Sequence, residues 1–93
     1  MRIQWTKRAG HNLEDVEAYI ARDNPEAAVR TVLKIVRAVE RLAHHPNIGK
    51  PGRVPGTREL VVAGTPYLVP YRIRGDVVEV LRVLHGAMRW PRK

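Results

Sequence analysis

Five basic residues lie in or directly after the predicted strands of the second half of the chain. They are Arg58, Arg72, Arg82, His85 and Arg89. Arginines on neighbouring strands can converge and bind phosphates or carboxylates through two parallel hydrogen bonds. A histidine side chain ordinarily titrates near neutral pH, so His85 is the natural general acid or base of the set. Such a set suits metal-independent RNA cleavage, in which Arg58, Arg72 and Arg82 would stabilise the charged phosphate around His85.

A purely structural role for the same residues is the alternative. The arginines would then be ordinary surface charges, with Arg72 paired to Glu79, and His85 would cap or brace the chain. Trp90 follows Arg89 and either stacks on a partner's base or side chain or closes the core against a helix. Tyr67 and Tyr71 are further candidates for proton transfer, and they suit the core equally well.

A second group of cations follows a helical spacing. Arg30, Lys34, Arg37 and Arg41 fall within about 60° of arc at 3.6 residues per turn. We refer to these four residues as the basic stripe. It is interpreted either as a solvated helix face or as a contact surface for a polyanion or an acidic protein.

Composition restricts the class of protein. The chain has 93 residues and a net charge of +8, and we expect one domain over residues 1–93. Residues 46–93 carry nine Lys or Arg against three Asp or Glu, so this half is the better surface for an acidic partner. The absence of cysteine fits a reducing compartment. With no signal-peptide core and no long apolar run, we expect a cytoplasmic protein without membrane contact.

No cofactor or metal motif is present in the sequence. It has no Gly-rich phosphate loop after a strand, no HExxH and no GxSxG. The adjacent His44 and His45 would point about 100° apart on a helix, so they are poorly placed to share a metal ion. We therefore expect no cofactor and no metal site.

The elements that must position these side chains follow from periodicity. We predict strands at 1–5, 57–62, 67–74 and 77–84, helices at 6–22 and 25–44, and a loop at 46–56 that is rich in Pro and Gly. One apolar stripe of the first helix holds Ala9, Leu13, Val16 and Ile20; the second helix has a broader stripe, Val29, Val32, Val36, Val39 and Ala43, widened by Ala28, Ile35 and Leu42. The order β-α-α-β-β-β predicts an α+β fold, with the helical hairpin on one face of a mainly antiparallel sheet.

The two-residue turn Gly75-Asp76 sets the register of the last hairpin. It places Tyr71 opposite Val80, Arg72 opposite Glu79, Ile73 opposite Val78 and Val69 opposite Arg82. Pro70 has no N–H to donate, which predicts a bulge or an unpaired stretch there. The expected core face holds Val69, Tyr71, Ile73, Val78, Val80 and Leu84.

Several segments resemble the RelE/ParE toxin superfamily of bacterial toxin–antitoxin operons. They are 57–60 (TREL), 71–73 (YRI) and 78–86 (VEVLRVLHG), preceded by 43–46 (AHHP) and 48–51 (IGKP), and the similarity runs in order over almost the whole chain. The resemblance implies the β-α-α-β-β-β fold already expected. It also implies a cognate acidic antitoxin, ParD-like or RelB-like, as the partner.

The resemblance implies one of two targets. ParE-like relatives poison DNA gyrase, whereas RelE-like relatives cleave mRNA on the ribosome. Residues 81–86 are more similar to the ParE-like branch. The RelE-like tail contains a late tyrosine, and in this chain no tyrosine follows Tyr71. The resemblance therefore favours a gyrase poison that is not an enzyme, with Arg58, Arg72, Arg82, Arg89 and Trp90 as the partner-binding surface. A ribosome-dependent mRNA endonuclease using His85 is the alternative, and a general nucleic-acid-binding module is the third reading.

Overall fold

The computed structural model describes residues 1–87 and 90–91. One strand, two helices and then a run of strands follow one another in the order that the sequence predicts. Within this part no helix is both long and apolar enough to cross a membrane. The elements, in chain order, are β1 (Arg2–Trp5), α1 (Lys7–Ala21), α2 (Pro25–Glu40), the 3-10 turn η1 (Arg41–Ala43), β2 (Lys50–Pro51), β3 (Arg58–Val61), β4 (Tyr67–Arg74), β5 (Val77–Val80) and β6 (Leu84–His85).

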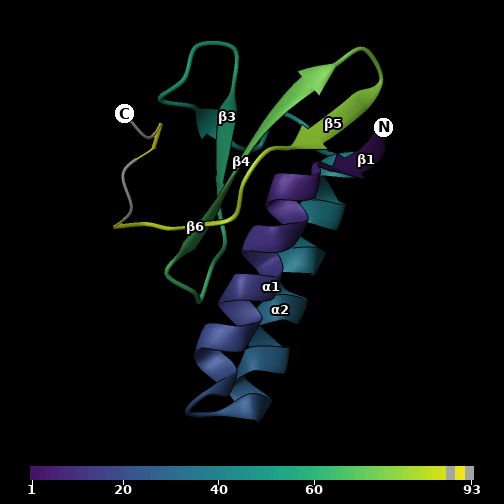
Figure 1. Cartoon of the computed structure of the whole chain (residues 1–93). Helices are drawn as coiled ribbons and strands as arrows, with labels where there is room; N and C mark the ends of the chain where they lie inside the picture. Colours follow the sequence, from purple (N-terminus) through teal and green to yellow (C-terminus); the bar gives the residue numbers. More distant parts are fainter. Residues whose placement is uncertain (88–89, 92–93) are drawn as a thin grey trace.

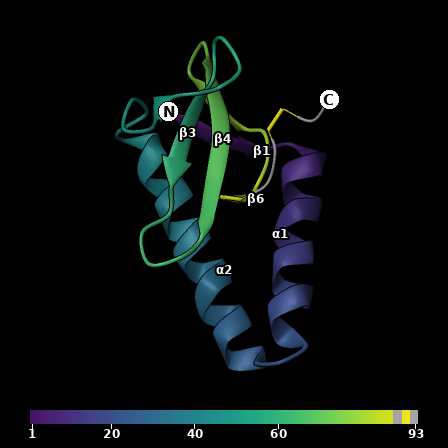
Figure 2. The ribbon, with the colours of Figure 1, turned by 90° about the vertical axis from the view of Figure 1, so that its left-hand side faces the viewer.

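The strands form one sheet against which both helices pack (Figure 1). Its order is β1-β5-β4-β3-β2, and β6 pairs with β4 beyond the end of β5. β1 runs parallel to β5, and every other pair is antiparallel. Figure 2 shows α1 and α2 lying side by side behind the sheet, so the other face of the sheet, called here the open face, carries no helix. The predicted α+β architecture is confirmed.

Side-chain caps begin both helices. The Thr6 hydroxyl accepts a hydrogen bond from the Ala9 N–H at 3.1 Å and donates to the Val80 carbonyl at 2.9 Å, which ties the start of α1 to the end of β5. Asn24 Oδ1 accepts from the Ala27 N–H at 3.0 Å, with Pro25 at the first helical position. The α-helical part of the second helix ends at Glu40, earlier than predicted, and continues as η1.

The hairpin between β4 and β5 has the predicted register, but the last strand is broken. Gly75, with φ of 61°, makes the turn, and Tyr71 lies opposite Val80. The predicted pairing of Val69 with Arg82 is wrong, because β5 ends at Val80 and both Leu81 and Arg82 lie opposite Pro70.

Pro70 causes this break. Since its nitrogen cannot donate, its carbonyl instead accepts from the N–H groups of both Leu81 and Arg82, at 2.9 and 3.4 Å. Two residues therefore oppose one, which is a β-bulge, as the proline predicted. The extra residue reverses the alternation, so that Val83 joins the helix-covered core cluster. Leu84 is buried as predicted, at 2% exposed, but outside that cluster.

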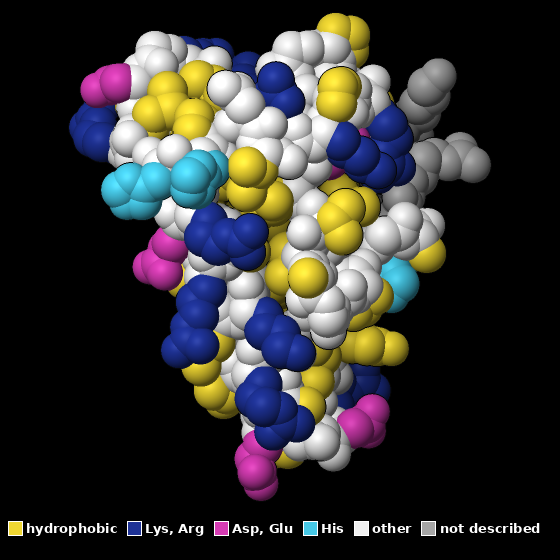
Figure 3. All heavy atoms as spheres, turned by 180° about the vertical axis from the view of Figure 1, so that it is seen from behind, with side chains coloured by type: hydrophobic (Ala, Val, Ile, Leu, Met, Phe, Trp, Pro, Cys, Tyr) yellow, Lys and Arg dark blue, Asp and Glu magenta, His cyan; other side chains and the backbone are white. Residues whose placement is uncertain are grey.

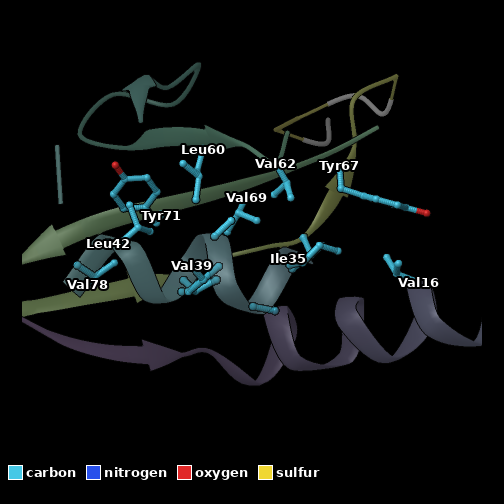
Figure 4. Packing of buried hydrophobic residues seen from close by; sticks show 14 residues of the cluster. Val16, Ile35, Val39, Leu42, Leu60, Val62, Tyr67, Val69, Tyr71 and Val78 are labelled. Atoms are coloured by element: carbon cyan, nitrogen blue, oxygen red, sulfur yellow. The ribbon is translucent and has the colours of Figure 1, made fainter. Parts of the chain in front are cut away.

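The core lies between the helices and the sheet (Figure 4). Ile73 and Val29 were both expected there, but they are 36% and 53% exposed. Ile73 is near the end of β4, and Val29 points away from the sheet because the buried side of α2 is centred on Ile35. The buried residues of α2 and η1 are Ala28, Ile35, Ala38, Val39 and Leu42.

The segment predicted as a loop at 46–56 contains a short strand. Lys50 and Pro51 form the short edge strand β2 against β3, with Lys50 opposite Glu59. Glu59 is only 2% exposed, and Arg53 donates to its carboxylate from the backbone N–H at 3.0 Å and from Nε at 3.1 Å. Burial opposes ionisation of Glu59, but these bonds from Arg53 outweigh it and hold the pKa of the carboxyl below its ordinary value.

Candidate functional site

Arg58 braces the loop before β2. Its Nη1 donates to the carbonyls of Gly49 at 2.7 Å and Asn47 at 3.2 Å. Arg58 lies opposite Tyr71 in the β3–β4 ladder, so the two side chains share the helix-covered face of the sheet. This arginine is thus committed to backbone carbonyls on the side of the sheet that faces the core.

Arg72 lies on the open face and forms an ion pair. Its Nε is 2.6 Å from Glu79 Oε1, and Arg74 Nε lies 3.6 Å from the same oxygen. The hydrogen bond from Arg72 lowers the pKa of Glu79 below its ordinary value. The pairing of Arg72 with Glu79, foreseen as the structural alternative, is therefore present.

Arg82 lies in the bulge and reaches toward α1. Its Nε donates to Asn12 Oδ1 at 2.8 Å, and its guanidinium carbon lies 5.6 Å from the centre of the Trp90 ring, within the range of a cation–π contact. Asn12 Oδ1 also accepts from the Val83 N–H at 3.2 Å. Trp90 therefore packs on an arginine of its own chain. Arg89, the remaining predicted arginine, lies outside the described residues.

His85 is on β6, at the opposite end of β4 from Arg72. Its Nδ1 accepts from the Ala87 N–H at 3.1 Å, and its ring meets Tyr67 edge-on at 5.7 Å between centroids. The imidazole is exposed and lines a groove of about 430 Å³ between α1 and β6. The groove is lined by Asn12, Asp15, Val16, Tyr19, Pro66, Tyr67, Val83, Leu84 and His85.

These residues do not converge on one point. His85 pairs with Tyr67, which is five residues from Arg72 along β4, or about 17 Å at the rise of a strand. Arg58 projects from the opposite face to Arg72, because neighbouring residues of a strand alternate and Arg58 shares the face of Tyr71. The predicted union of one histidine with three arginines is absent from the described part of the chain.

The two buried tyrosines are poorly suited to proton transfer. Burial raises the pKa of Tyr67, and burial also raises that of Tyr71, against the opposing hydrogen bond from Gly49. Both side chains belong to the core cluster. Among the described residues, no group of three or more His, Asp or Glu side chains is arranged to hold a metal ion.

The basic stripe is present and exposed. Arg30, Lys34 and Arg37 project from α2 into solvent, and Arg41 projects from η1. Figure 3 shows a row of Lys and Arg side chains over the helical part of this face. Three of the four residues line a shallow groove of about 240 Å³, whose lining is Lys34, Arg37, Ala38, Arg41, Val62 and Ala63.

The roles of two polar residues, Glu59 and Asn12, were not predicted from the sequence. Glu59 stands between Arg58 and Leu60 in a strand pattern, which was a signal for a buried, paired carboxylate, although its partner Arg53 was not foreseen. Asn12 carries no sequence signal, because its role depends on contacts with residues 70 or more positions away.

Comparisons with known proteins agree with this geometry. The model of the family described as ParE toxin of type II toxin-antitoxin system, parDE, matches residues 3–90. The protein named "Putative toxin Y4kP" of Sinorhizobium fredii is 51% identical over 90 residues, covering 97% of this chain and 93% of its own. "Toxin RelE2" of Caulobacter vibrioides is 34% identical, covering 91% of this chain and 94% of its own.

A solved structure has the same fold. The structure described as the chromosomal ParDE TA system from P. aeruginosa superposes with a TM-score of 0.82 at 31% identity, covering 91% of this chain and 95% of that one. The family match spans the sheet, both helices and the bulge. The chain therefore belongs to the ParE toxin family, within the RelE/ParE superfamily of type II toxin–antitoxin systems.

Proposed function

We propose that this toxin arrests growth by poisoning DNA gyrase, as the ParE-like branch does, rather than by cleaving RNA. The observation that carries the proposal is the separation of His85 from Arg72 along β4, together with the position of Arg58 on the other face of the sheet from Arg72. General acid–base catalysis needs the proton-transferring group within hydrogen-bond reach of the reacting atoms. An imidazole about 17 Å along the strand from Arg72 does not meet that requirement in one active site.

A gyrase poison needs a recognition surface instead of a reaction centre. The proposed surface contains Arg72 and Arg82, with Trp90 beside Arg82. Of the other predicted residues, Arg58 lies on the opposite face of the sheet from Arg72, and Arg89 lies outside the described residues. Arg72 and Arg82 are fixed by Glu79 and Asn12, which reduces the conformational entropy lost when they meet an anionic partner. The ion pair on the open face thus supports binding as well as folding.

We further propose that a cognate acidic, ParD-like antitoxin neutralises the toxin. The net charge of +8 favours an acidic partner, and the groove between α1 and β6 offers apolar surface beside Tyr19, which is 69% exposed. A segment that is disordered alone and folds on binding would suit such an open groove. Co-expression with the small open reading frame next to the gene, followed by co-purification, tests this part.

The experiment for the target is induction of the toxin in bacteria, with His85→Gln and a matched His44→Gln control. Both histidines are exposed, and each change removes a titratable ring. A gyrase poison should cause double-strand breaks and an SOS response, and both variants should retain these effects. Transcript cleavage that precedes DNA damage, and that His85→Gln alone abolishes, would show the ribosome-dependent endonuclease. A chain that binds nucleic acid and stops no growth would show a general binding module.

A further inference from the structure

The basic stripe is a straight row of uncompensated charge. Its four residues span positions 30 to 41, about 16 Å along the helix axis at 1.5 Å per residue. None of the four side chains has an Asp or Glu oxygen within 4.0 Å among the described residues. Glu26 and Glu40 are the acidic residues of the same helix, and neither forms an ion pair with the stripe.

The segment that faces the stripe, residues 60–71, supplies no acidic side chain to neutralise it. Residues 60–71, which include the β3–β4 turn, contain no acidic or basic side chain. Val62 and Ala63 form the far wall of the shallow groove. Lys34 Nζ lies near the turn, 3.4 Å from the position that a Cβ atom on Gly64 would occupy. The groove therefore has one cationic wall and one neutral wall.

We propose that the basic stripe binds the phosphate backbone of duplex DNA. A rigid row of cations matches a regular line of phosphates in charge and in form. The groove has no aromatic side chain on which unstacked bases could lie, which disfavours single strands. Contacts from cations to phosphate oxygens carry no sequence information directly, so a contact made through the backbone should depend little on sequence. This inference rests on the proposed function in one respect: the DNA is that which gyrase holds.

The first measurement uses the full chain without gyrase. Fluorescence anisotropy with two unrelated 20-base-pair duplexes, across a range of salt concentrations, should give the same affinity for both. Four phosphate contacts predict a slope of about −3.6 for log affinity against log salt. Tighter binding to a single strand of the same length would overturn the proposal.

Matched double variants locate the contact. Lys34→Gln with Arg37→Gln removes two charges from the stripe, whereas Lys7→Gln with Arg22→Gln removes the same two residue types from exposed positions at the ends of α1. The stripe variant should show a slope near about −1.8 and bind about 60-fold more weakly at 0.1 M salt, while the control should keep a slope close to the parent's. Circular dichroism verifies that both fold. Equal losses of DNA affinity in the two variants would contradict a contact located at the stripe. The proposal would also be contradicted if the stripe bound poly-glutamate and did not bind DNA.

A second measurement separates this inference from the proposed function. If gyrase is the target and the stripe holds its DNA, the stripe variant should need a higher concentration than the control to poison gyrase. Loss of DNA binding with unchanged poisoning would refute the stripe's role and leave gyrase as the target. Stripe-dependent DNA binding by a chain that leaves gyrase fully active would support the DNA contact and refute the proposed target.

Discussion

Replacing Tyr71 with phenylalanine tests how the loop before β2 is held. The Tyr71 side chain is fully buried, and its hydroxyl makes two hydrogen bonds to that loop. It accepts from the Gly49 N–H at 2.9 Å and donates to the Pro46 carbonyl at 2.7 Å. Gly49 is itself buried, so water cannot easily replace the lost acceptor.

The magnitude follows from these two bonds. Tyr71→Phe keeps the ring, so the loss is confined to the hydroxyl and to the unsatisfied Gly49 N–H. We expect unfolding free energy to fall by about 2–3 kcal/mol. For a domain of this size, that corresponds to a decrease in Tm of roughly 10–20 °C.

The assay is urea and thermal unfolding followed by circular dichroism. Tyr67→Phe is the matched control, because the Tyr67 hydroxyl makes no hydrogen bond among the described residues and its loss should change stability by less than about 0.5 kcal/mol. A Tyr71→Phe protein that melts within 2 °C or so of the parent would refute the reasoning, as would equal losses in both variants.

Three further changes test the remaining contacts, all by urea unfolding. Glu59→Gln should cost about 1.5–3 kcal/mol at neutral pH by weakening its bonds from Arg53. Because folding lowers the pKa of Glu59, its contribution to the free energy of unfolding should be complete above the ordinary pKa of 4.5 and be lost as pH falls through the folded-state pKa. Glu59→Gln should lack this part of the acid dependence of stability. Parallel pH profiles for the parent and the variant would contradict the assignment. Asn12→Ala removes the acceptor for Arg82 and Val83 and should cost about 1–3 kcal/mol, whereas an unchanged midpoint would mean that the bulge holds without it. Thr6→Ala should cost about 1–2 kcal/mol through loss of the helix cap, and Thr6→Ser should recover most of it; failure of serine to rescue would exclude capping as the cause.

Periodicity and turn chemistry predicted most of the fold. The bounds of β4 and its register with β5 followed from alternating residues and from the Gly75-Asp76 turn. Pro70 marked the bulge because a missing N–H is a local property that can be read from one residue. The consequence of the bulge, a reversed face for Val83 and Leu84, was not predicted because the number of inserted residues depends on the partner strand.

The site was harder to predict, since it depends on contacts between distant segments. The sequence identified Arg58 as basic and strand-borne, but its bonds to the Gly49 and Asn47 carbonyls require the loop to fold back on β3. The edge strand β2 is only two residues long, too short for a periodic signal. By contrast, the shared exposed face of the basic stripe was predicted, because helical spacing alone determines which of its side chains lie on one face.

The most direct test of the central claim is DNA cleavage by purified gyrase in the presence of the purified toxin. We expect supercoiling to fall and linear DNA, covalently attached to gyrase, to accumulate as toxin is added, and we expect His85→Gln to behave like the parent. Supercoiling and cleavage that stay unchanged at a large excess of folded toxin, while the same preparation cuts mRNA on programmed ribosomes, would contradict the claim.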